Sequence, residues 1–201
     1  MRSVDTLLAM LMAGFLLTLE GCALTPQQVQ LKPIVASASA PTPPVGGKRS
    51  IALTTADERL SSAIGSRGLN NGMSAEITTR DDVGSVVRGQ LESALLARGF
   101  EVTTATDPDI RELRVEVRNL EYNVTPGIVT GHLRAEAALK GICSEQGSRK
   151  YEHLYRGEST EEVFVVQFAE ENEKHLNTAL GNVILQLLGD QSLFDCLAAR
   201  E

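Results

Sequence analysis

The sequence is short of the residues from which most binding and catalytic sites are built. It has no tryptophan, five phenylalanines, three tyrosines, three histidines and three cysteines among 201 residues. A site that stacks sugars or nucleobases on aromatic rings would have little to draw on. No block of lysine and arginine occurs, and the formal net charge is −7. No nucleic-acid partner is expected, because phosphate binding depends on clustered cationic side chains.

Known catalytic and metal-binding motifs are also missing. The sequence has no Gly-x-Ser-x-Gly, no glycine-rich phosphate loop and no His-Glu-x-x-His. Its histidines, His132, His153 and His175, have no ligand-like spacing with a cysteine. The sequence therefore predicts no metal site and no cofactor, and we expect a protein that is not an enzyme.

The longest apolar run, residues 7–19, is too short to cross a bilayer as a helix, which needs about 20 residues. It follows Arg2 and ends at Leu19-Glu20-Gly21-Cys22. This arrangement predicts a lipoprotein signal peptide over residues 1–21, cleaved before Cys22, with lipid on the Cys22 thiol. The alternative is an ordinary signal peptide with an unrelated cysteine near its cleavage point.

Lipid on Cys22 would anchor the protein to a membrane, since two or more acyl chains hold where one binds only marginally. The residue after Cys22 is Ala23 and not aspartate, which in enterobacterial-type lipoproteins implies export to the outer membrane. We therefore expect a lipid-anchored protein on the periplasmic face of the outer membrane.

Two further cysteines, Cys143 and Cys196, would then remain in an oxidising compartment. They form either a disulfide or two separate buried thiols.

Residues 22–48 are predicted to form a flexible tether. The segment holds most of the prolines and ends in two glycines, although Val29 and Leu31 alternate with polar neighbours and also allow a short strand. Proline-rich chains favour extended polyproline geometry. Residues 49–201 are predicted to form one periplasmic domain, since their number suits a single hydrophobic core.

Hydrophobic periodicity indicates the elements of that domain. Apolar residues repeat at three and four over residues 81–98 and 169–188, which predicts two long helices, and Asp190 is expected to cap a short terminal helix. Residues 113–124 alternate, with a phase slip that predicts a bulge near Asn119. Strands are expected to return at 133–139 and 150–157. The predicted fold is α+β, a two-layer domain with both long helices on one face of a largely antiparallel sheet.

A long loop, residues 56–74, is expected between the first strands, because the segment is rich in glycine, serine and asparagine. Asp57 and Arg59 lie at its entrance, and side chains two residues apart share a face of an extended chain. They are a candidate binding pair or a structural ion pair that holds the loop. On the strand near the second long helix, Tyr151, His153 and Tyr155 also share a face, which is either a ligand wall or ordinary strand composition.

Several features together carry a resemblance to a known family. They are the signal-peptide cleavage site, the tether, Asp57-Glu58-Arg59 after the first strand, the helix ending Ala97-Arg98-Gly99-Phe100, the predicted meander and the closing Asp190-Gln191-Ser192-Leu193. In this order the chain resembles the YajG family of bacterial lipoproteins from Cys22 to the last helix. The resemblance implies an outer-membrane lipoprotein with an α+β domain, and it supplies no catalytic residues.

Two hypotheses about function follow. The first is a non-enzymatic binding or accessory lipoprotein that presents the 56–74 loop or an open sheet face to an envelope protein. The second is an envelope hydrolase or transferase with an unrecognised site around Asp57, Arg59 and His153. The first is favoured by the lack of catalytic motifs.

Overall fold

The computed structural model describes residues 25–35, 45–69, 73–104, 109–126, 130–163 and 169–199. The predicted signal peptide, residues 1–21, and the predicted lipidation site, Cys22, lie outside these ranges. Among the helices of the described ranges, none combines the length and apolar character that a membrane span requires.

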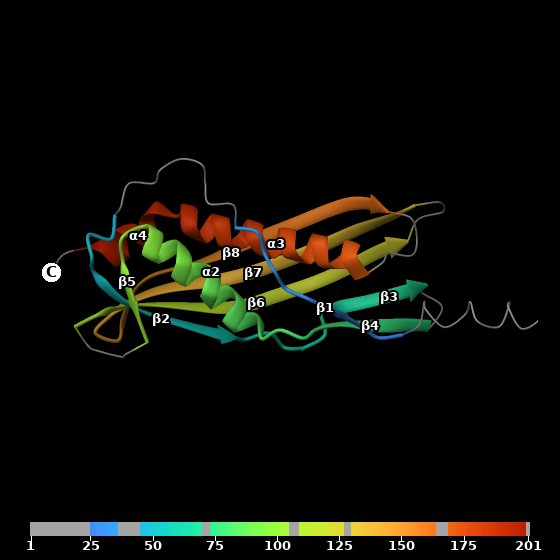
Figure 1. The fold of residues 1–201 in the computed structure, drawn as a ribbon, viewed down its shortest axis with the longest axis horizontal. Helices are drawn as coiled ribbons and strands as arrows, with labels where there is room; N and C mark the ends of the chain where they lie inside the picture. The colour runs from blue at the N-terminus through green and yellow to red at the C-terminus, as the bar shows by residue number, and fades with distance from the viewer. Residues whose placement is uncertain are drawn as a thin grey trace, which may run out of the picture.

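The domain is built on one eight-stranded sheet. The strands are β1 (Gln27–Val29), β2 (Ser50–Asp57), β3 (Gly65–Leu69), β4 (Met73–Thr79), β5 (Glu101–Thr103), β6 (Arg111–Pro126), β7 (Gly131–Glu145) and β8 (Ser148–Val163). They follow the order β1-β4-β3-β6-β2-β5, while β7 pairs with β6 and β8 pairs with β7. Figure 1 shows β1, β3 and β4 gathered at one end of the long strands and β2 and β5 at the other.

The predicted fold class is wrong, because the sheet is mixed and curled into a half-barrel and strands make up 46% of the structure. Four strand pairs are parallel, namely β1/β4, β2/β5, β2/β6 and β3/β6. Three are antiparallel, namely β3/β4, β6/β7 and β7/β8. Parallel partners are joined by long connections and leave no hairpin turn in the sequence, so periodicity alone did not reveal them.

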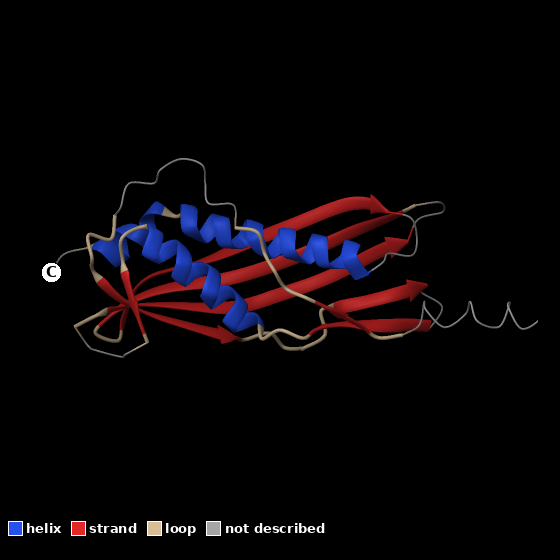
Figure 2. Cartoon of the chain, in the orientation of Figure 1, coloured by secondary structure: helices blue, strands red, loops and turns tan. Residues whose placement is uncertain are grey.

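Within the described part of the chain, three helices cover one face of the sheet (Figure 2), two long and one short. They are α2 (Val83–Ala97), α3 (Ala169–Gly189) and α4 (Gln191–Ala198). The helices predicted at 81–98 and 169–188 are confirmed as α2 and α3, and Asp190 caps α4 through the N–H groups of Ser192 and Leu193. The core lies between these helices and the inner face of the sheet.

The bulge predicted near Asn119 is confirmed, because the β6/β7 register shifts between Val117 and Asn119. Val115 and Val117 are fully buried before the shift, and Leu120 and Tyr122 are buried after it. One strand can thus keep the same face in the core although its apolar residues change from odd to even positions.

Cys143 and Cys196 are joined in a disulfide that links β7 to α4. Cys143 is fully buried in the core. Of the two alternatives that the sequence left open, the structure therefore contains the bridge.

Part of the segment expected to be a tether belongs to the domain. Residues 27–29 form β1, parallel to β4, and the side chains of Val29 and Leu31 are buried. The backbone N–H of Leu31 donates to Asp81 Oδ2 at 2.7 Å. Residues 27–31 of the predicted tether therefore belong to the domain, and the short strand that the sequence allowed there is β1.

The long loop expected over residues 56–74 is partly strand. β2 runs to Asp57, β3 begins at Gly65, and β3 and β4 form an antiparallel pair. Gly65 suits this strand because a Cβ there would lie 2.1 Å from the carbonyl oxygen of Tyr122 in β6. Glycine and serine favour a loop, but here the glycine allows two strands to approach closely. The loop between β2 and β3 is thereby reduced to residues 58–64.

Candidate functional site

The 58–64 loop spans a junction on one edge of β6. β2 pairs with this edge up to Val117, and β3 pairs with it at Tyr122. The loop is fixed at both ends by backbone hydrogen bonds, from Glu58 N to Val117 O at 3.0 Å and from Tyr122 N to Ile64 O at 2.7 Å. The chain leaves the sheet between these two points, opposite the bulge in β6.

A pocket of about 360 Å³ lies between this loop and β6. Its lining includes Arg59, Leu60 and Ile64 from the loop side and Arg118, Leu120 and Glu121 from β6. Leu60 is fully exposed, whereas Ile64 and Leu120 are buried. The pocket therefore combines a buried apolar floor, charged groups and one apolar side chain that projects into solvent.

Asp57 and Arg59, the pair predicted as a candidate site, lie at the start of the loop, and Arg59 lines the pocket. Arg59 Nε donates to Asp57 Oδ1 at 2.9 Å and Nη2 donates to Oδ2 at 2.8 Å. This two-point hydrogen bond from Arg59 lowers the pKa of the Asp57 carboxyl, although partial burial opposes the shift. The pair has the structural role that the sequence suggested, since it fixes the end of β2 to the loop.

The same guanidinium keeps one donor unused. Only 8% of the Arg59 side chain is exposed, and its Nη1 is buried without a hydrogen-bond partner. A buried donor without an acceptor costs about 1–3 kcal/mol. An incoming carboxylate or carbonyl oxygen that displaced the atoms covering Nη1 would recover this cost, so Arg59 can serve both the loop and a ligand.

The other charged groups at the pocket already have partners. Arg118 Nη1 lies 3.4 Å from Glu116 Oε2, and Glu121 Oε1 accepts a hydrogen bond from Asn123 Nδ2 at 2.8 Å. A highly charged ligand would have to break these pairs. A single acceptor group with an apolar neighbour fits the pocket better.

His153, the third residue of the predicted enzymatic alternative, lies elsewhere. Across the neighbouring strands β2, β6, β7 and β8, Asp57 is in register with Val117, Leu139 and Tyr155. Tyr155 is two residues from His153. Three strand spacings separate Asp57 from that position, or roughly 14 Å along the sheet. The exposed His153 ring instead packs against Tyr155, with ring centroids 4.8 Å apart. The structure therefore does not gather the three residues.

Tyr151 and Tyr155 form an anchor for the last helix rather than an open ligand wall. Both hydroxyls donate to Asp190 Oδ2, at 2.7 and 2.6 Å, while Asp190 Oδ1 accepts from the first N–H groups of α4. Burial opposes ionisation of Asp190, but the hydrogen bonds from Tyr155 and Tyr151 outweigh it and lower the pKa. Burial and the bond to Asp190 raise the pKa of Tyr155, and the same bond raises that of Tyr151.

This anchor predicts a loss of stability at both ends of the pH scale. The folded pKa of Asp190 is lowered, so its contribution is present above the usual value of 3.8 and is lost as pH falls below it. The folded pKa values of the tyrosines are raised, so their contribution is present below the usual value of 10.0 and is lost at higher pH. Urea unfolding across the pH range should show both losses.

The control for this experiment is Tyr151→Phe combined with Tyr155→Phe. Without the hydroxyls the alkaline loss should disappear and the acid loss should shrink, because Asp190 keeps only its bonds to the α4 backbone. A variant with the same alkaline loss as the natural protein would contradict the assignment.

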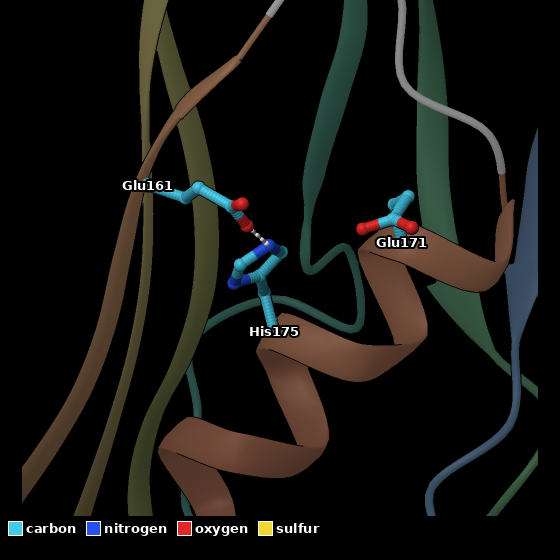
Figure 3. A group of neighbouring side chains, drawn as sticks. All are labelled: Glu161, Glu171 and His175. Carbon is cyan, nitrogen blue, oxygen red and sulfur yellow. Dashed lines mark ion pairs between the residues drawn. The ribbon is translucent and has the colours of Figure 1, made fainter.

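A further polar group lies where β8 approaches the start of α3 (Figure 3) and includes Glu161, Glu171 and His175. His175 Nε2 lies 2.7 Å from Glu161 Oε2, and His175 Nδ1 lies 2.9 Å from Ser159 Oγ. Sequence reasoning missed the group because it compared the histidines only with cysteines. The four-residue spacing of Glu171 and His175, which puts both on one helix face, was the available signal.

These observations define a disulfide-linked domain of mixed sheet and helices that carries a small surface pocket. Residues 36–198 match the model of a family described as uncharacterized lipoprotein. The match covers most of the chain, which therefore belongs to this family of bacterial lipoproteins. A search of curated proteins finds no match.

Several solved structures are similar to the chain. A minor lipoprotein from Acinetobacter baumannii shares 12% identity over 70% of this chain and 88% of its own, with a TM-score of 0.47. A protein from Xanthomonas campestris shares 16% identity over 82% of this chain and 91% of its own, with a TM-score of 0.49. The rare lipoprotein B from Shewanella oneidensis shares 14% identity over 72% of this chain and 97% of its own, with a TM-score of 0.41.

Proposed function

We propose that this lipoprotein is a non-enzymatic accessory factor of the cell envelope, anchored through Cys22 to the periplasmic face of the outer membrane. Its binding surface is the pocket under the 58–64 loop, and its partner is a segment of an envelope protein. The observation that carries the proposal is the buried, unused Nη1 donor of Arg59 beside the fully exposed Leu60.

The chemistry of the pocket favours a peptide segment as the partner. Peptides supply carbonyl or terminal carboxylate oxygens next to apolar side chains, which suits a guanidinium donor beside an exposed leucine. Leu60 resembles an interface anchor, because an exposed large apolar residue gains most when a partner covers it. The separation of Asp57 and Arg59 from His153 supports a binding role over the enzymatic alternative.

The test is photocrosslinking in intact cells with a photoreactive residue in place of Leu60. We expect one discrete protein adduct, which should weaken when Arg59→Lys is added, because lysine keeps the charge but cannot provide the guanidinium fork. The same reagent in place of Leu96, which is 53% exposed on α2, is the matched control and should give no such adduct.

A second control addresses the membrane anchor. Cys22→Ser cannot receive the lipid, so the position-60 adduct should be lost if the partner is met at the membrane. Identical adducts from positions 60 and 96 would show random collisions and overturn the assignment of the pocket. A blank at position 60 in a folded, lipidated protein would also overturn it.

A further inference from the structure

The group formed by Glu161, Glu171 and His175 differs from an ordinary surface ion pair in the position of its histidine. Only 5% of the His175 side chain is exposed, whereas 47% of each glutamate side chain is exposed. One oxygen or nitrogen from each residue lies within 4.8 Å of the other two. Figure 3 shows the imidazole held by α3 between the two carboxylates, with Glu161 reaching across from β8.

The contact between His175 and Glu161 is close but is not a hydrogen bond. Nε2 is 2.7 Å from Glu161 Oε2, yet this buried nitrogen has no hydrogen-bond partner. The oxygen therefore lies to one side of the direction in which the ring nitrogen points. This leaves the ring axis of Nε2 open to a metal ion, which would have the carboxylate oxygen as a second ligand at an angle to that axis once the oxygen has moved outward.

Ser159 provides the outer contact that metal-binding histidines usually have. Its Oγ lies 2.9 Å from His175 Nδ1 and can accept that N–H, which leaves a lone pair on Nε2 for a metal ion. Lys174 forms a loose ion pair with the group, its Nζ lying 3.8 Å from Glu171 Oε2. Two carboxylates around a buried imidazole thus form a locally anionic site.

We infer that Glu161, Glu171 and His175 bind a divalent transition-metal ion of the Zn²⁺ class, which links the end of β8 to the first turns of α3. Bonds of about 2.1 Å to a tetrahedral ion place the ligand atoms about 3.4 Å apart, so side-chain shifts of about 1 Å suffice. The exposed glutamates can make such shifts while His175 stays fixed.

The donor set determines the class of ion. One imidazole nitrogen with two carboxylate oxygens suits Zn²⁺, Co²⁺ or Ni²⁺, whereas Ca²⁺ and Mg²⁺ favour oxygen ligands throughout. Three protein ligands leave a tetrahedral ion one position for water. The site is independent of the Arg59 pocket, which lies on the β2–β3 loop, so either assignment can fail without the other.

The test is titration of the full-length protein, purified in detergent, with Zn²⁺ followed by calorimetry and with Co²⁺ followed by visible absorption. We expect one ion per chain and the absorption bands of a low-symmetry Co²⁺ site. Glu161→Gln combined with Glu171→Gln should weaken Zn²⁺ binding about tenfold or more. Glu162→Gln combined with Glu170→Gln, on the same two elements and with the same change of charge, should leave it unchanged.

A third variant, His175→Gln, should remove the Co²⁺ bands while circular dichroism confirms that the protein is folded. If that variant does not fold, the two double variants with glutamine in place of glutamate still test the metal site, because their substitutions lie at solvent-accessible side chains. The inference would be overturned if the natural protein did not bind Zn²⁺, or if the two double variants bound it equally. Either result would mean that His175 and Glu161 form an ion pair only.

Discussion

Reduction of the Cys143–Cys196 disulfide should lower the free energy of unfolding by about 4 kcal/mol. The bridge closes a loop with a sequence separation of 53 residues, and the chain-entropy relation gives this value for a loop of that length. Domains of this size have a free energy of unfolding of about 5–15 kcal/mol, so the reduced protein would keep only part of its stability. Urea unfolding with and without reductant measures the change.

The reduced protein should nevertheless keep α4 in place. Leu193, Phe194 and Leu197 are buried against the core, and the Arg98 guanidinium stacks 4.1 Å from the centre of the Phe194 ring. The loss should therefore be a change in global stability through the unfolded chain. Hydrogen exchange in α4 would rise no faster than in the rest of the core.

The matched variant is Cys143→Ala combined with Cys196→Ala. Reductant should not affect its stability, which shows that the effect in the natural protein comes from this bridge and not from the reagent. A shift below about 1 kcal/mol on reduction of the natural protein would contradict the loop-closure argument.

The parts of the fold that sequence predicted are those governed by neighbouring residues. The stripes of α2 and α3, the alternation along β6 and the slip at Asn119 all reflect which side of one element is buried. Pairing between distant strands leaves no such local pattern. For that reason the parallel neighbours of β2 and β6 were missed.

The candidate site shows the same division. The two-residue spacing of Asp57 and Arg59 made their ion pair one of the predicted alternatives, and the structure contains it. The unused Nη1 of Arg59 and the pocket depend on where β3 rejoins β6, which is a contact between distant segments. The approach of Glu161 to His175 likewise requires β8 to extend past the strand end predicted at residue 157.

Gly157→Ala should destabilise the protein by about 3 kcal/mol, the upper end of the cost of overpacking. α3 lies directly on β8 at this point, and an added Cβ would be 2.3 Å from Ala179 O and 2.5 Å from Val183 N. Both are backbone atoms of a helix, so no side-chain rotation can relieve the clash. The helix must move away from the sheet, where Leu180 and Leu187 are fully buried.

The same change at Gly89 should have the opposite sign. Gly89 is exposed within α2, and an added Cβ would meet nothing within 4 Å. Alanine is favoured over glycine inside a helix by about 0.8–1.0 kcal/mol, so Gly89→Ala should stabilise the protein by that amount. Urea unfolding of both variants compares one methyl group in two settings. Similar effects at the two sites would mean that α3 does not contact β8 at Gly157, whereas opposite signs would establish that glycine there is required for close approach of helix and sheet.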